Sequence, residues 1–129
     1  MELEEFTERF IDELSGGQLQ RAYIAMVIAQ DTEFVFLDEP TNNLGIYHSS
    51  NMMKLVRRLC DELGKTVILV LHEINFASAY SDYIGAFKNG ELYKFGEVKE
   101  VMTKENLKEL YGVDFDIQMI KDRPISIYY

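Results

Sequence analysis

Two adjacent carboxylates, Asp38 and Glu39, are the first residues in the sequence whose position suggests chemistry. They end the apolar run 35–37 and come directly before Pro40. In open α/β sheets, ligands bind at the carboxyl ends of parallel strands. Neighbouring strand residues point to opposite sides, so Asp38 could hold Mg²⁺ through water while Glu39 orients or deprotonates an attacking water molecule. The alternative is structural: the two residues are a helix-capping pair beside a turn at Pro40.

A histidine ends the other strongly apolar run of the chain. His72 follows residues 67–71, which are Val, Ile, Leu, Val and Leu. An imidazole at the same edge of a sheet could donate a hydrogen bond to a phosphate and respond to its loss. A lone histidine at the end of a strand is otherwise a structural residue. His48 has no such context, and we expect it to be solvated near the start of a helix.

A third pattern lies upstream, at Ser15, Gly16, Gly17 and Gln18. The spacing S-x-x-Q before an apolar periodic run is that of a capping box, which predicts that a helix begins at this point. Two glycines leave the first backbone N–H groups uncovered, and such a helix end attracts anions. The Ser15 hydroxyl could add a donor. The alternative is a well-capped surface helix.

Taken in order, these three patterns resemble the ATP-binding cassette (ABC) ATPases. Leu-Ser-Gly-Gly-Gln, then a strand with Asp-Glu-Pro, then a strand with His follow one another at the family's rough spacing. The resemblance runs over nearly the whole chain but covers only the C-terminal half or so of such a domain. It implies an α/β fold, the C-terminal portion of a P-loop NTPase, with a parallel βαβ core followed by an antiparallel hairpin and short helices.

The resemblance also assigns roles to these residues. In the family, ATP and Mg²⁺ lie between two ATPase domains, as in a homodimer of the complete protein. The signature residues Ser15, Gly16, Gly17 and Gln18 would contact a nucleotide held by the second domain. Asp38 would serve the metal, and Glu39 and His72 would act catalytically at the γ-phosphate.

The phosphate-binding loop of this family is not found in the sequence. Gly64-Lys65-Thr66 looks like the end of such a loop, but the pattern G-x-x-x-x-G-K-[ST] requires glycine where Leu59 stands. The three residues also lie between a helix and a strand, which is the reverse order, so we interpret them as a helix stop. We therefore expect a C-terminal piece of a longer ATPase that is inactive alone, and the status of this chain as an enzyme stays open.

The loop after Glu39 departs from the family in one residue. Asn43 and Leu44 are followed by Gly45, where the family has Asp. By resemblance this loop lies at the interface of the two ATPase domains. Gly45 weakens the cap of the following helix by a few tenths of a kcal/mol. It also removes an interface carboxylate, which weakens the case for cooperative hydrolysis.

Several segments resemble the ATPases of bacterial iron(III)–siderophore importers, namely residues 38–44, 72–78, 80–84, 88–91, 96–102 and 125–129. The resemblance implies transmembrane permease subunits as partners and a peripheral position at the cytoplasmic face of the bacterial membrane. Two alternatives stay open. The chain could be a non-catalytic module that docks on a complete ATPase, or a soluble ABC protein of DNA repair or translation.

Composition limits the possibilities further. The 129 residues carry a net charge of −9 without a basic stripe, which argues against direct nucleic-acid binding. The single cysteine, Cys60, cannot form an internal disulfide and is expected to be a buried or half-buried apolar residue. The longest apolar run, 22–29, is too short to cross a bilayer, and the acidic first residues do not fit a signal peptide. We expect a soluble, cytosolic chain.

The pattern of apolar residues and turn signals predicts the elements. By resemblance to the ABC ATPases, residues 1–30 should end a helical subdomain and 31–129 should form the C-terminal part of the catalytic core. Strands 34–37 and 66–71 are continuously apolar, which predicts burial on both faces. A domain cut in the middle should also expose apolar faces, so we expect self-association. The expected helices are 2–14, 15–30, 47–63, 73–80, 97–102 and 104–111, and the expected hairpins are 83–88 with 91–95 and 115–120 with 125–129 around a turn at 122–124.

Overall fold

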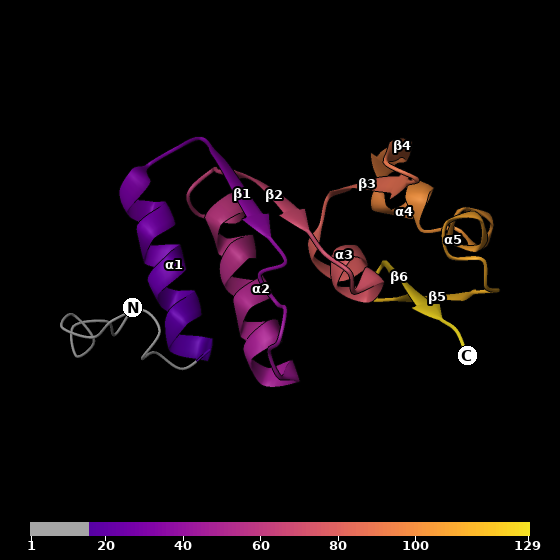
Figure 1. Ribbon diagram of the computed structural model, residues 1–129, viewed down its shortest axis with the longest axis horizontal. Coiled ribbons are helices and arrows are strands. Elements are labelled where there is room, and N and C mark those ends of the chain that lie inside the picture. Colours follow the sequence, from indigo (N-terminus) through magenta and orange to yellow (C-terminus); the bar gives the residue numbers. More distant parts are fainter. Residues whose placement is uncertain (1–15) are drawn as a thin grey trace. The chain divides into compact units, whose positions relative to one another are not determined.

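The computed structural model describes residues 16–129 and divides into two compact units, with the boundary between Leu71 and His72. Figure 1 shows the elements of both units. The helix expected over residues 2–14 and the capping role expected of Ser15 lie outside the described residues.

Unit 1, as far as it is described, is a βαβ unit preceded by a helix. Strands β1 and β2 are parallel, and their register runs from Phe34 opposite Thr66 to Asp38 opposite Val70. The parallel pair confirms the predicted βαβ core, and the helix between the strands is the crossover that parallel strands require. The elements are α1 (Gly16–Gln30), β1 (Phe34–Asp38), α2 (Ile46–Asp61) and β2 (Thr66–Val70).

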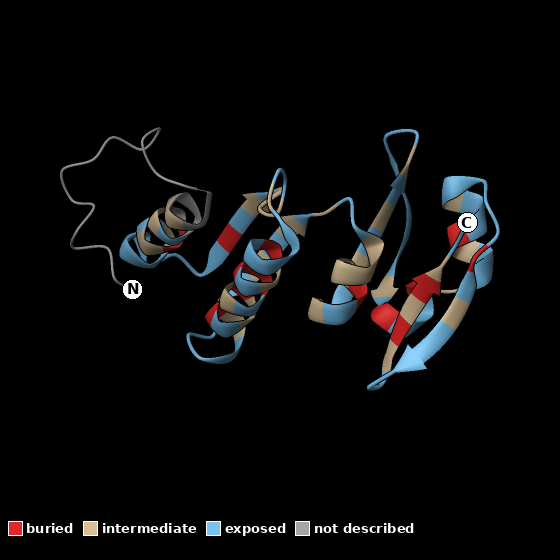
Figure 2. Cartoon of the chain, turned by 90° about the horizontal axis from the view of Figure 1, so that it is seen from below, coloured by how far each residue is buried: buried red, intermediate tan, exposed pale blue. Residues whose placement is uncertain are grey.

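The core of unit 1 lies between its helices and one face of its sheet. Its buried members are Ile24, Met52, Val56 and Leu59, and half-buried Val27, Leu37, Leu55, Val67 and Leu69 pack against them. Along both strands buried or half-buried residues alternate with exposed ones (Figure 2). Since one stripe of each helix faces the core, two helices suffice to cover only this face of the sheet.

The prediction that both faces of these strands are buried is wrong for this chain. The exposed fractions are 53% for Phe34, 73% for Phe36, 47% for Ile68 and 51% for Val70. These four residues, here called the open face, alternate with the core residues and therefore lie on the other side of the sheet. The continuous apolar run is thus the sequence of a two-sided strand, whereas the described elements of unit 1 supply helices for one side.

The segment Gly64-Lys65-Thr66 is a helix stop, as predicted. Gly64 has φ +65°, and its N–H donates to the Cys60 carbonyl over 3.1 Å. Lys65 is turned inward, with 8% of its side chain exposed, and its ammonium donates to the Thr32 carbonyl over 2.7 Å. This lysine therefore ties the turn before β1 to the start of β2. Cys60 is half-buried, which also agrees with the prediction.

Unit 2 is built from two antiparallel hairpins and three short helices. Asn89 and Gly90 have φ +52° and +79°, which is the two-residue turn that their sequence predicts. The hairpin that they close contains an irregularity in register between Ala86 and Phe87. The elements are α3 (Ile74–Tyr80), β3 (Tyr83–Lys88), β4 (Glu91–Glu97), α4 (Val98–Val101), α5 (Lys104–Tyr111), β5 (Asp116–Ile120) and β6 (Arg123–Ile127).

The terminal hairpin is confirmed, but its turn lies earlier than predicted. Lys121 and Asp122 form the turn with φ +48° and +64°, while Arg123 and Pro124 pair within β6, opposite Ile120 and Met119. A two-residue turn of this kind needs positive φ at both positions, and the ring of proline holds φ near −65°. Pro124 is therefore excluded from the turn and accepted in the strand.

Unit 2 has a core of its own. It consists of buried Val98, Met102, Leu107 and Phe115, with half-buried Ile74, Ile84, Leu110 and Ile117 against them. The predicted cap of α5 is confirmed, because the Thr103 hydroxyl accepts a hydrogen bond from the Asn106 N–H at 3.2 Å. None of the helices described in residues 16–129 combines the length and the apolar character needed to cross a membrane.

Candidate functional site

The two carboxylates lie at the carboxyl end of β1, as predicted. Asp38 is the last residue of the strand, is exposed, and stands opposite Val70. The Glu39 N–H donates to the Val70 carbonyl over 3.0 Å, which extends the ladder by one bond. The Glu39 carbonyl in turn accepts from the Asn42 N–H at 3.0 Å and closes a turn over Pro40. The two hydrogen bonds fix the backbone of Glu39 at the sheet edge.

Glu39 has a left-handed backbone conformation, with φ +47°. For a residue with a Cβ atom this conformation costs of order 1–3 kcal/mol, and such residues cluster at functional sites. The strand geometry would otherwise simply continue past Asp38. The positive φ redirects the chain at Glu39. Glu39 is half-buried, whereas Asp38 is exposed. The sequence gives no signal for this conformation, because glutamate is not a residue that favours positive φ.

The donor set at this edge suits a cation that keeps most of its water. Among residues 16–129, no three His, Cys, Asp or Glu side chains gather closely enough to hold a metal ion by themselves. Mg²⁺ is usually bound by one or two carboxylates, with water and phosphate oxygens as the other ligands. The exposed carboxylate of Asp38 meets that requirement.

The loop that follows connects this edge to α2. Asn43 has φ +60°, and the Leu44 N–H donates to the Thr41 carbonyl over 3.3 Å. Gly45 is the N-cap of α2, with φ −67° and ψ 162°, and no side chain caps the helix. This agrees with the weak cap expected from glycine at this position. Asn43 and Gly45 are exposed.

Helix α1 begins at Gly16, at the position that the S-x-x-Q pattern predicts. Gly16 and Gly17 form its first turn, and Gln18 is half-buried. The first turn contains no acidic residue. The positive end of the helix dipole is therefore not neutralised from within the turn, which is the condition for attracting an anion.

His72 is exposed and is the first residue of unit 2. The next residue, Glu73, caps α3, since its carboxylate accepts from the N–H groups of Asn75 (3.1 Å) and Phe76 (2.7 Å). His48 is exposed, as expected, with its ring edge-on to Tyr47 at 5.3 Å. Asp38, Glu39 and loop residues 43–45 thus share one edge of unit 1, while His72 opens unit 2.

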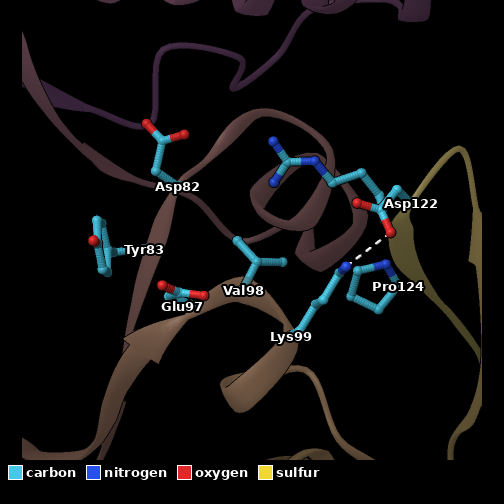
Figure 3. Close-up of a pocket in the computed structure, with 8 residues that line it drawn as sticks. Asp82, Tyr83, Glu97, Val98, Lys99, Asp122 and Pro124 are labelled. Atoms are coloured by element: carbon cyan, nitrogen blue, oxygen red, sulfur yellow. Dashed lines mark hydrogen bonds and ion pairs between the residues drawn. The ribbon is translucent and has the colours of Figure 1, made fainter.

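Unit 2 contains a hollow that sequence reasoning did not find. It has a volume of about 340 Å³, and an ion pair of 2.8 Å between Lys99 and Asp122 crosses its rim (Figure 3). Its lining is mostly charged and comes from the residue before β3, the hairpin β3–β4, α4, the terminal turn and the start of β6: Asp82, Tyr83, Glu97, Val98, Lys99, Asp122, Arg123 and Pro124. These residues form no motif, because they are scattered along the chain.

Comparisons with known proteins agree with the geometry of the two units. The family model described as ABC transporter matches residues 1–42. The petrobactin import ATP-binding protein YclP of Bacillus subtilis (strain 168) is 53% identical over 129 residues, which are 100% of this chain and 51% of that protein. The chain belongs to the ABC transporter family. It spans about half the length of the curated relatives that it matches.

Two further matches describe the same group. The iron(3+)-hydroxamate import ATP-binding protein FhuC of B. subtilis (strain 168) is 44% identical over 127 residues, covering 97% of this chain and 47% of that protein. A solved structure of a metal-chelate type ABC transporter in an inward-facing conformation is 27% identical, with a TM-score of 0.85 over 98% of this chain and 53% of the other. The ABC ATPase fold expected from the sequence is confirmed by this likeness.

Proposed function

We propose that this chain is the C-terminal part of the ATP-hydrolysing subunit of an ABC importer. The observation that carries the proposal is the edge of β1, where exposed Asp38 and half-buried Glu39 adjoin and Glu39 is held at positive φ. The family of the chain supports ATP and Mg²⁺ as ligands. Residues 1–30 would close the helical subdomain, and residues 31–129 would complete the catalytic core.

Each residue has a role in this proposal. Asp38 holds Mg²⁺ through water, and the ion neutralises phosphate charge when bound. Glu39 orients or deprotonates the attacking water, and His72 donates to the γ-phosphate. The signature residues 15–18 bind a nucleotide held by a second ATPase domain, and loop residues 43–45 lie at that interface.

The cargo that we propose is an iron(III)–siderophore chelate. The support is the named activity of the relatives, petrobactin import and iron(3+)-hydroxamate import. The subunit would lie at the cytoplasmic face of the bacterial membrane, bound to transmembrane permease subunits that contact the cargo. The chain by itself would be inactive, and its open face would cause it to self-associate.

The test uses the complete ATPase, meaning this chain joined to the N-terminal half that its relatives carry. We expect Glu39→Gln to lower ATP turnover by about 10² to 10⁴, because a general base contributes a factor of that size. Binding of Mg-ATP should be retained. Glu33→Gln is the matched control, since Glu33 is exposed just before β1, and it should leave turnover unchanged.

Two results would contradict the proposal. Unchanged hydrolysis in Glu39→Gln would remove this residue from its role. Tight Mg-ATP binding without any turnover in the unsubstituted complete protein would favour the second candidate, a non-catalytic module that docks on another ATPase. The absence of a phosphate-binding loop from this sequence is the observation behind that candidate.

A further inference from the structure

Helix α3 is attached to strand β6 by a side-chain amide that pairs with the strand's backbone. The Asn75 Nδ2 donates to the Ser126 carbonyl over 3.1 Å. The Asn75 Oδ1 accepts from both the N–H and the hydroxyl of Ser126, each at 2.8 Å. Ser126 is 4% exposed and Asn75 is half-buried, so these bonds are partly shielded from water. One side chain thus satisfies three polar groups of a buried strand residue.

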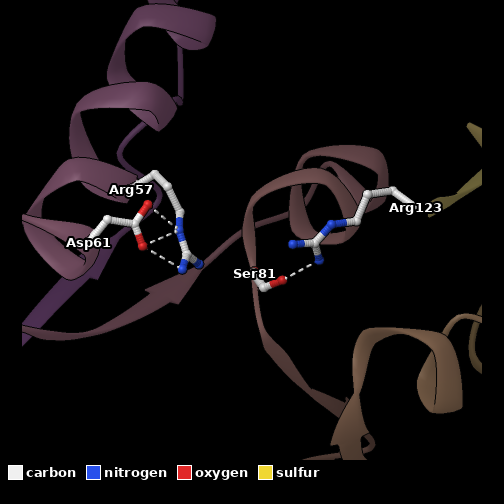
Figure 4. A network of polar contacts seen from close by, with 4 residues as sticks. All are labelled: Arg57, Asp61, Ser81 and Arg123. Carbon is white, nitrogen blue, oxygen red and sulfur yellow. Dashed lines mark hydrogen bonds and ion pairs between the residues drawn. The ribbon is translucent and has the colours of Figure 1, made fainter. Parts of the chain in front are cut away.

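Two more hydrogen bonds join helix α3, or the residue that follows it, to strand β6. The Ser78 hydroxyl donates to the Pro124 carbonyl, and Ser78 is fully buried. The Arg123 guanidinium donates to the Ser81 carbonyl over 2.7 Å, as Figure 4 shows. Asn75 and Ser78 are three residues apart and therefore lie on one face of the helix. The helix is held at its start, middle and end, and runs antiparallel to β6.

The attachment lies immediately after His72 in the chain. Glu73 caps α3 by accepting from the N–H of Asn75, so Asn75 is fixed through its backbone as well as its side chain. Ile74, between them, packs against the core of unit 2. The backbone that leaves His72 therefore enters a helix whose first turn is held by a cap, a core contact and the amide pair.

We infer that Asn75 is a positioning residue for His72, acting through α3 and the terminal hairpin. The inference rests on the proposed contact of His72 with the γ-phosphate. Hydrogen bonds depend strongly on distance and angle, whereas apolar contacts tolerate small shifts, so the amide pair fixes one register of α3 on β6. A γ-phosphate contact requires such precision, because a donor must lie within about 3 Å of its acceptor.

The experiment measures nucleotide affinity in the complete ATPase, in the Glu39→Gln form so that ATP persists. We expect Asn75→Ala to weaken Mg-ATP binding about tenfold, because it would misplace His72 and so remove the hydrogen bond from His72 to the charged γ-phosphate. A hydrogen bond to a charged group contributes roughly that factor to affinity. Affinity for ADP, which lacks the γ-phosphate, should stay within about twofold. In a His72→Ala background, Asn75→Ala should cause no further loss of ATP affinity, because both changes remove the same contact.

Two variants serve as controls. Asn75→Asp keeps the acceptor for both donors of Ser126 but places a carboxylate oxygen where Nδ2 donates to the Ser126 carbonyl, so it should lose ATP affinity as Asn75→Ala does. Asn51→Ala removes an exposed asparagine of α2 and should change neither affinity. If Asn75→Ala fails to fold, Ser126→Ala removes only the hydroxyl bond and should give a smaller loss that is again confined to ATP.

The outcomes separate this inference from the proposed function. Equal losses of ATP and ADP affinity, or the same loss of ATP affinity in the His72→Ala background, would overturn the positioning role alone. Two other results would overturn the proposed function of this site and the inference with it. One is that the Glu39→Gln protein does not bind ATP. The other is that it binds ATP and ADP with equal affinity and that His72→Ala changes neither affinity.

Discussion

The two units of this chain obtain their structure in different ways. Unit 1 pairs two parallel strands across a long crossover and covers one face of them. Unit 2 connects each pair of strands by a two-residue turn and closes a core from neighbouring helices and hairpins. The strand pairs of unit 2 are therefore close in sequence, and contacts such as α3 with β6 and Lys88 with Glu109 join elements that are farther apart along the chain. The residues assigned to metal and water chemistry lie in unit 1.

The difference between the units indicates which part of the chain needs another protein surface to cover its apolar residues. The open face of unit 1 is apolar over both strands, and a monomeric protein seldom exposes such a patch. Unit 2 also exposes apolar residues on its first hairpin, where Tyr83 and Phe95 stack at 5.9 Å. Its core, however, does not include that face. Unit 2 should therefore be the more self-sufficient of the two.

The largest expected effect comes from separating the units. Residues 72–129 should fold alone, and residues 1–71 should not, because the described part of unit 1, residues 16–71, forms a core on one side of its sheet only. Amide NMR spectra of the two pieces measure this directly. Well-dispersed signals from residues 1–71, or their absence from residues 72–129, would reverse the comparison.

The second prediction concerns association of the whole chain. Phe36, at 73% exposure, is the most exposed member of the open face, and Phe36→Lys should lower the association constant at least tenfold by placing a charge there. Light scattering at micromolar concentration measures the mass. Phe87→Lys, on the hairpin of unit 2, is the matched control and should have a smaller effect. A monomeric unsubstituted chain would contradict this prediction.

The third prediction concerns the core of unit 2. Leu107 is 2% exposed, and Leu107→Ala should lower the free energy of unfolding by about 2–5 kcal/mol, through lost burial and the cavity left behind. Urea unfolding followed separately in each unit measures this value. Leu92→Ala, at an exposed position of the same unit, should cost much less. Equal costs would mean that Leu107 is not part of a packed core.

A smaller effect, of opposite sign, is expected in unit 1. Gly45 has the extended backbone of an N-cap, and an added Cβ meets nothing within 4 Å. Gly45→Asp should therefore stabilise α2 by a few tenths of a kcal/mol. Gly64→Asp is the contrasting control: φ is +65° there, so the same substitution should destabilise by about 1–2 kcal/mol. Thermal unfolding of both variants measures whether the backbone conformation at each glycine determines the sign of the stability change.

The smallest expected effect is that of acid on surface ion pairs. In unit 2, a hydrogen bond from Lys104 holds the pKa of Asp116 below its usual range, and a hydrogen bond from Lys88 does the same for the pKa of Glu109. A folded pKa below the unfolded value means that the stabilisation is present above the unfolded pKa, near 4, and is lost as the pH falls through the folded pKa.

Acid should therefore lower the urea midpoint of unit 2 more than that of unit 1. The pairs of unit 2 join different elements, whereas Arg57 and Asp61 (Figure 4) lie one turn apart in a single helix. Exposed pairs contribute little individually, so the shift should be small and should shrink in high salt. The same shift in both units would show that long-range pairing has no influence.

Much of the local structure was determined by the sequence alone. Asn89-Gly90, Gly64 and Thr103 each set a turn, a stop or a cap through bonds to residues a few positions away. The order of motifs also sufficed to predict the family and the location of Asp38 and Glu39 at a strand end. Signals of this kind are readable because the groups involved are neighbours along the chain.

Other features were decided only by tertiary structure. The apolar runs of β1 and β2 predicted burial on both faces, but burial depends on which elements are present to cover a face. The positive φ of Glu39 is imposed by its bonds to Val70 and Asn42. Asn75 pairs with Ser126, 51 residues away. No local pattern encodes that pairing, because the hairpin β3–β4, the helices α4 and α5 and the strand β5 lie between the two residues along the chain.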